Sequence, residues 1–193
     1  MKRVCVFTGS SPGARPEYAA AAQQFGAEIA GRGYELVYGG GRVGLMGVIA
    51  DAVLASGGRV IGVIPENLVA KEIGHSGLTE LRIVKSMHER KALMADLSDA
   101  FVAMPGGIGT MEEFFEVLTW AQLGLHAKPC GLLQVAGYFD ALLALLDRAV
   151  QERFVKAEHM TMLIASVSPT ELLDRLAAYR APLVDKWIDR RSS

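Results

Sequence analysis

The segment AFVAMPGGIGTMEEFFEVLTWAQLG (100–124) holds a complete strand, turn and helix, and it indicates the fold of the whole chain. Residues 100–107 begin with an uninterrupted apolar run, which is typical of a strand buried on both faces of a parallel sheet. Three glycines then mark a turn, and residues 110–125 carry apolar side chains at helical spacing. A strand joined to a helix by so short a link is the repeating unit of an α/β protein.

The same alternation extends along the rest of the chain. We expect further strands at 3–9, 35–41, 59–65, 80–86, 130–135 and 162–167, helices at 16–33, 43–57, 87–98, 138–153 and 169–179, and a loop at 66–77. This pattern predicts a doubly wound, Rossmann-like α/β fold with a mostly parallel sheet flanked by helices. We expect one nucleotide-binding domain at 1–180 and a loosely held tail at 181–193, with Trp187 as its anchor.

Composition narrows the class of protein. The chain has 193 residues, 51% hydrophobic and 21% charged, which is typical of a globular domain. A formal net charge of −1 gives no reason to expect a nucleic acid or an anionic membrane as partner. Cys5 and Cys130 lie in apolar runs, which favours a reducing compartment. With no signal peptide or membrane-spanning run evident, we expect a cytoplasmic protein.

Ligands of such folds bind beyond the carboxyl ends of the strands. The turns at 9–13, 39–44, 85–91 and 105–110 occupy that edge. Their candidate contacts to a phosphate or ribose are Gly9, Ser10, Gly40, Gly41 and Met87. The turn GGGRVG (39–44) also matches a dinucleotide fingerprint, but it follows the second strand rather than the first, and no acidic residue ends the next strand.

The turn PGGIGT (105–110) is suited to an anion, because free amides and the helix dipole meet there. It lacks the lysine of a phosphate-binding P-loop. Thr110 and Glu113 fit a capping box, so Glu113 has two interpretations: a helix cap or a functional carboxylate. Glu112, Glu116 and Thr119 fall on one face of the predicted helix.

The stretch KSMHERK (85–91) places cations where a helix disfavours them. Ser86 and Glu89 form a second capping box, so the helix should begin at residue 87. His88, Arg90 and Lys91 then crowd its first turns, against the dipole. This arrangement indicates either a solvated basic face or a negative partner, and the planar guanidinium of Arg90 suits the latter best.

The helix at 110–125 is apolar nearly all round. Phe115, Trp120 and Leu123 lie off its core stripe, so we expect a homodimer with this helix near the interface. The alternative is that a neighbouring helix of the same chain covers these side chains. The four histidines show no metal-ligand spacing, and we expect neither a metal nor a cofactor.

Several ordered motifs together resemble the LONELY GUY-type cytokinin riboside 5′-monophosphate phosphoribohydrolases. These motifs are YGGGRVGLMG (38–47), MHERK (87–91), PGGIGTMEE (105–113), EVLTWAQLGLH (116–126) and KPCGLL (128–133). The resemblance implies that Arg90 and Glu113 are catalytic. It also implies substrate contacts by Glu72, Lys91, Gly106, Gly107, Ile108, Gly109, Thr110, Met111, Glu112 and Thr119. The chain departs from the family at Ile108, often tyrosine, and at Thr8, often cysteine.

The activity implied by this resemblance is hydrolysis of the N-glycosidic bond of N6-substituted adenosine 5′-monophosphates, to the free base and ribose 5-phosphate. A general AMP or nucleotide nucleosidase would use the same residues, and a nucleotide-binding protein without catalysis would share the fold. Members of the family have carried a lysine decarboxylase label, but no lysine here suggests a pyridoxal phosphate site. The sequence does not order isopentenyl, hydroxylated and unmodified adenines as substrates.

Overall fold

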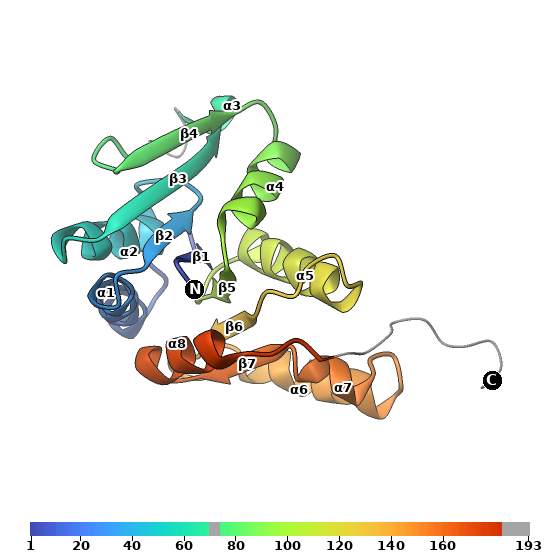
Figure 1. Cartoon of the computed structure of the whole chain (residues 1–193). Coiled ribbons are helices and arrows are strands. Elements are labelled where there is room, and N and C mark those ends of the chain that lie inside the picture. Colours follow the sequence, from blue (N-terminus) through green and yellow to red (C-terminus); the bar gives the residue numbers. More distant parts are fainter. Residues whose placement is uncertain (70–73, 183–193) are drawn as a thin grey trace.

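The computed structural model describes residues 1–69 and 74–182, and within them seven parallel strands form one sheet in the order β4-β3-β2-β1-β5-β6-β7 (Figure 1). The strands are β1 (Arg3–Phe7), β2 (Glu35–Tyr38), β3 (Arg59–Pro65), β4 (Glu80–Val84), β5 (Ala100–Ala103), β6 (Cys130–Leu133) and β7 (Leu163–Ser166). Glu72 and Trp187, which the sequence singled out, lie outside the described residues. The predicted doubly wound α/β fold is confirmed.

Helices cover both faces of the sheet. One face carries α1 (Pro16–Gly31), α2 (Gly44–Ala55) and α8 (Pro169–Ala178), and the other carries α4 (Met87–Leu97), α5 (Ile108–Gln122) and α6 (Asp140–Gln151) (Figure 1). In the described part of the chain, no helix is both long and apolar enough to cross a membrane.

Alternate side chains of each central strand enter opposite cores. On β1, Val4 and Val6 pack into the core beneath α1 and α2, whereas Cys5 and Phe7 pack into the core beneath α4 and α5. This is why the strand sequences are continuously apolar: each side chain leaves water whichever way it points.

The chain reverses its direction of winding between β1 and β5, which are neighbours in the sheet. Val4 pairs with Ala100 and Phe7 with Ala103. From β1 the chain passes to α1 on one face, and from β5 it passes to α5 on the other. The turns after these strands therefore diverge and leave a crevice, which is the usual position of a ligand in such sheets.

Two short helices were not predicted. Helices α3 (Glu66–Val69), within the expected loop at 66–77, and α7 (Ala157–Met160) have four residues each. One turn of helix is too short to show a 3.6-residue period, so the pattern of apolar residues does not reveal it.

The two predicted capping boxes have different outcomes. Ser86 caps α4, and its hydroxyl accepts the amide N–H of Glu89 at 3.1 Å, as expected. The prediction that Thr110 caps the next helix is wrong. Helix α5 begins at Ile108 with Gly107 as its N-cap, so Thr110 lies inside the first turn and is buried. The glycine turn is tight enough to start the helix before the threonine.

His126 joins the end of α5 to β6. Its Nε2–H donates to the Val117 carbonyl at 2.9 Å, and its Nδ1 accepts the Lys128 amide N–H at 3.1 Å. The bond that Nδ1 accepts requires the neutral imidazole with its proton on Nε2. Burial lowers the pKa of His126, the Val117 bond opposes that change, and the nearby charge of Lys128 lowers the pKa further.

We predict that neutral His126 contributes a pH-dependent part of the free energy of unfolding. Because the pKa is lower in the folded state, the unfolded chain binds the proton first as pH falls through about 6.5, and the contribution is then lost. In urea unfolding at pH 7.5 and 5.5, His126→Asn should lose less stability on acidification than the wild type. The exposed His88→Asn is the matched control, and an unchanged pH dependence in His126→Asn would contradict the prediction.

Candidate active site

A cavity of about 390 Å³ opens where β1 and β5 end. It combines the turns after these strands with the first turns of α2, α4 and α5. The residues that line it are Thr8, Gly9, Ser10, Met46, Met87, Arg90, Gly107, Ile108, Gly109, Thr110, Glu112 and Glu113. Most of the predicted site therefore comes together at the crevice between the two strands.

The glycine turn presents the N-terminus of α5 to this cavity. The Pro105 carbonyl accepts the Gly9 amide at 3.1 Å and the Thr8 hydroxyl at 3.0 Å, so the turn is attached to the end of β1. Gly106 has no room for a side chain, since a Cβ there would lie 2.2 Å from the Thr110 hydroxyl. The first amides of a helix have no intrahelical acceptor, and here they are suited to an anion.

Arg90 enters the cavity from α4 and is only 6% exposed. Its Nη2 donates to the Gly39 carbonyl at 3.1 Å, and its Nη1 lies 3.6 Å from the Met87 sulfur. A Cβ at Gly39 would lie 2.0 Å from Nη2, which explains the glycine. The buried Nε has no hydrogen-bond partner in the described part of the chain. A buried guanidinium with an unused donor is suited to a polar or anionic ligand.

Glu113 supplies a carboxylate to the same cavity. It is the sixth residue of α5, beyond the first turn, so the interpretation that it caps the helix is wrong. Burial raises the pKa of the Cys5 thiol on β1, and the charge of Glu113 raises it further, whereas Arg90 lowers it. Arg90 and Glu113 are thus both close enough to β1 to act on one buried thiol.

Lys91 does not line the cavity itself, but it pairs with Glu112, which does. Its Nζ contacts Glu112 at 2.6 Å and Glu116 at 3.0 Å, which joins α4 to α5. Burial lowers the pKa of Lys91, but the bonds to Glu112 and Glu116 outweigh burial and leave that pKa raised. Lys91 therefore compensates the charges of Glu112 and Glu116, which share one face of α5. Glu113 lies outside this cluster of three side chains.

Other candidates lie apart from the main cavity. The Gly40 carbonyl accepts the His75 amide at 3.0 Å, and Gly41 bridges to Gly74. Gly106 lines a second cavity behind the glycine turn. Met111 is half-buried against the core, and Thr119 is exposed farther along α5.

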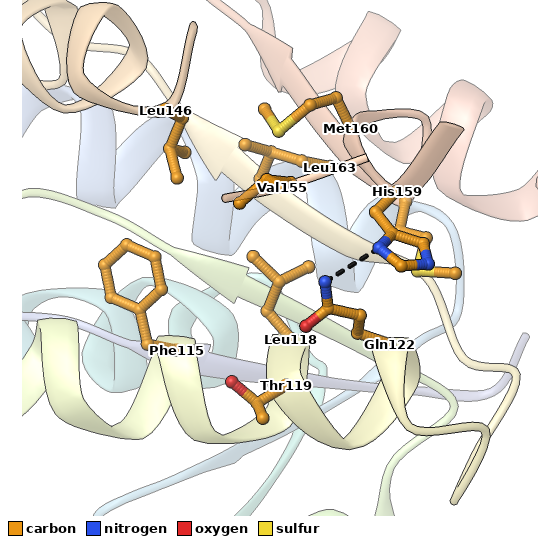
Figure 2. A pocket seen from close by; sticks show the side chains of 10 residues that line it. Phe115, Leu118, Thr119, Gln122, Leu146, Val155, His159, Met160 and Leu163 are labelled. Carbon is orange, nitrogen blue, oxygen red and sulfur yellow. Dashed lines mark hydrogen bonds between the residues drawn. The ribbon is translucent and has the colours of Figure 1, made fainter. Parts of the chain in front are cut away.

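Thr119 borders a separate apolar cavity of about 190 Å³ between α5 and the region of α6, α7 and β7 (Figure 2). Phe115 and Leu118 face Leu146 and Leu163 across it. At one wall, Gln122 Nε2 lies 2.7 Å from His159 Nδ1. This cavity is on a different side of α5 from Glu113.

Sequence reasoning did not assign Thr8 and Met46 to the site, although both line the main cavity. Thr8 follows the last residue of β1, and Met46 lies in the first turn of the helix after the second glycine-rich turn. Their positions after strand ends were the feature of the sequence that could have indicated a place in the site. Neither side chain has the charge that usually draws attention to such a position.

Comparisons with known proteins show the family to which the chain is related. A family described as "Possible lysine decarboxylase" matches residues 46–176. The probable cytokinin riboside 5′-monophosphate phosphoribohydrolase LOGL5 of Oryza sativa subsp. japonica is 51% identical over 181 residues, which is 94% of this chain and 74% of the relative. The cytokinin riboside 5′-monophosphate phosphoribohydrolase LOG1 of Arabidopsis thaliana is 48% identical over 191 residues, 99% of this chain and 89% of the relative.

Solved structures share the fold at lower identity. The X-ray structure of TM1055 is 23% identical with a TM-score of 0.69, over 93% of this chain and 100% of that chain. The molybdenum cofactor carrier protein of Chlamydomonas reinhardtii is 20% identical with a TM-score of 0.67, over 92% of this chain and 99% of that chain. At these identities the likeness concerns the fold alone. The family match and the plant relatives go further, and the chain belongs to the LONELY GUY family of phosphoribohydrolases.

Proposed function

We propose that this protein hydrolyses cytokinin riboside 5′-monophosphates to the free base and ribose 5-phosphate. One observation carries the proposal: the amides at the start of α5, the guanidinium of Arg90 and the carboxylate of Glu113 line one cavity. An anion site beside a carboxylate suits a substrate with a phosphate at one end and a cleavable sugar carbon near it. The names of the plant relatives specify that substrate class.

The phosphate lies on the amides of Gly107, Ile108 and Gly109, with help from the hydroxyl of Thr110. The helix dipole favours negative charge at this position, so the turn needs no lysine of its own. The ribose then extends toward Glu113, five residues farther along α5 than Ile108. Met87 and Met46 provide apolar surface in the cavity for the base.

Cleavage breaks the bond between the anomeric carbon and the base nitrogen. Positive charge develops on the sugar, as in glycoside hydrolysis. The Glu113 carboxylate stabilises that charge and orients or deprotonates the attacking water. The water oxygen joins the anomeric carbon, and the base leaves with the bonding electrons and takes up a proton.

Arg90 has an electrostatic role in this mechanism. A guanidinium stays protonated at any working pH, so Arg90 is not the proton donor. Its Nη2 is occupied by Gly39, and its Nε is available to the ligand or the reacting carboxylate. From this position Arg90 offsets the negative charge that develops on the departing base.

We also propose a homodimer formed through α5 and α6. Within the chain, Trp120 packs against the core and Phe115 lines the apolar cavity with Leu146, so neighbouring elements cover part of the predicted interface. Two apolar side chains that are adjacent in sequence to the lining residues Leu146 and Val155 nevertheless remain exposed: Leu145 by 64% and Phe154 by 87%. A second copy would bury them.

Thr119 supports the same arrangement. It lies seven positions after Glu112, which is about 10 Å along a helix, and it does not line the main cavity. If Thr119 contacts substrate, as in the family, a dimer allows it to reach the cavity of the other copy.

We also propose a location in the cytoplasm. The two buried free cysteines are in keeping with such a reducing compartment.

The proposed function is tested by a chromatographic assay with isopentenyladenosine monophosphate, AMP and isopentenyladenosine in parallel. We expect release of isopentenyladenine from the monophosphate and little from the riboside, because the riboside lacks the group that the α5 amides hold. Adenine release from AMP at an equal or higher rate would identify a general nucleotide nucleosidase. No release from any of them, by folded protein, would overturn the proposal.

Glu113→Gln should lower kcat at least about a hundredfold, since it removes the charge beside the anomeric carbon. Binding of AMP, measured by calorimetry, should persist because the α5 amides are unchanged. Glu116→Gln is the matched control, with the same chemical change on the same helix outside the cavity. Near-normal turnover by Glu113→Gln would remove the carboxylate from the mechanism.

Light scattering at micromolar concentration should give twice the mass of one chain. Phe154→Glu should shift the protein toward monomer, because it places a charge in the proposed apolar interface. Val167→Glu, at a side chain that is also strongly exposed (78%) but lies after β7, should remain a dimer. A monomeric wild type would refute the dimer.

A further inference from the structure

Three successive carbonyls of the glycine turn are held by hydrogen bonds from outside the turn or from α5. Pro105 accepts from Gly9 and Thr8, as described above, and Gly107 accepts the Met111 amide at 3.2 Å within the first turn of the helix. Between them, the Gly106 carbonyl accepts the hydroxyl of Tyr138. Tyr138 lies in the connection between β6 and α6, so this bond joins the turn to a different part of the chain.

The direction of a carbonyl fixes the direction of the next amide. In a trans peptide the C=O of one residue and the N–H of the following residue point in opposite directions. The described residues contain no cis peptide. The bond from Tyr138 to the Gly106 carbonyl therefore sets where the Gly107 N–H points.

Two cavities lie on either side of this peptide. The second cavity, of about 270 Å³, is lined by Tyr18, Tyr138, Pro105 and Gly106, while the main cavity is lined by Ile108, Gly109 and Thr110. Both cavities share Gly9, Ser10 and Gly107. With its carbonyl held on the Tyr138 side, the peptide directs the Gly107 N–H toward the main cavity.

This peptide needs an external anchor more than its neighbours do. It joins two glycines, which restrict rotation of a peptide plane least of all residues. The bonds to Pro105 and Gly107 come from backbone or threonine groups next to the turn, whereas in the described part of the chain Tyr138 is the donor to Gly106. The second cavity also provides space into which the turn could relax without that donor.

Tyr138 is itself held in place. Ala136 and Gly137, immediately before Tyr138, adopt positive φ angles of 51° and 72°. Gln134 closes this connection through its Oε1, which accepts the Phe139 amide at 2.8 Å. The Tyr138 ring meets Tyr18 edge to face at 5.8 Å between centroids. A positive φ at alanine is uncommon, and here it lies two residues before Tyr138.

We propose that Tyr138 is a positioning residue for phosphate recognition: its hydroxyl holds the Gly106 carbonyl so that the Gly107 amide faces the phosphate of the substrate. This inference rests on the proposed function and assigns part of its selectivity for monophosphates to a side chain outside the main cavity. The amide acts on the phosphate, not on the reacting carbon. Loss of the hydroxyl should therefore weaken binding and leave the chemical step intact.

Tyr138→Phe removes the hydroxyl and keeps the ring packing. We expect KM for the nucleoside monophosphate to rise about fivefold, as for loss of one hydrogen bond, while kcat stays within about twofold. The dissociation constant of ribose 5-phosphate, measured by calorimetry, should rise by the same factor. Any turnover of the riboside should be unchanged, so preference for the monophosphate falls about fivefold.

Tyr18→Phe is the matched control, because it removes a hydroxyl from the wall of the same cavity without touching Gly106. It should behave as wild type, and thermal unfolding of all three proteins separates a loss of stability from a loss of binding. Wild-type affinity for ribose 5-phosphate in Tyr138→Phe would overturn the inference, as would an equal loss with monophosphate and riboside. If the wild type cleaves nothing, the proposed function fails, yet the comparison of ribose 5-phosphate binding still decides the role of Tyr138.

Discussion

The pairing of β1 with β5 is the constraint on which the site depends. Because these strands are adjacent and parallel, their carboxyl ends lie side by side, and the chain leaves them toward opposite faces of the sheet. The bonds from Thr8 and Gly9 to the Pro105 carbonyl extend this pairing into the two turns. The α5 N-terminus is thereby fixed relative to β1 by a main-chain bond and by the Thr8 hydroxyl.

The distribution of charge around α5 explains how a glycine turn can be followed at once by carboxylates. In the proposed mechanism the phosphate binds to amides, whose partial positive charge extends only over the first turn of the helix. Glu113 lies beyond that turn, where we propose that it acts on the sugar instead. Glu112 also lines the cavity, but Lys91 compensates its charge together with that of Glu116. Negative charge near the anion site is thus either offset by Lys91 or placed beyond the first turn of the helix.

Most of the fold could be predicted from the sequence, because strands buried on both faces and helices longer than two turns leave strong periodic patterns. The one-turn helices α3 and α7 leave none. The start of α5 was misjudged because a capping-box pattern does not show whether the preceding glycines have already begun the helix. In the site, charge and unusual placement drew attention to Arg90 and Glu113. The neutral Thr8 and Met46, and the distant Tyr138, become visible only when the strand order brings separate turns together.

Helix α5 has a different role on each of its sides, and this limits how far the helix can shift or rotate. Phe114 and Val117 are buried in the core, and Glu113 borders the proposed catalytic cavity. Phe115 borders the apolar cavity, close to the surface that we assign to the dimer. Because a helix is rigid over such a length, a rotation that adjusts one side moves the others. Dimer formation through α5 would therefore also set the position of Glu113, which couples assembly to catalysis without any contact between the partner and the reacting atoms.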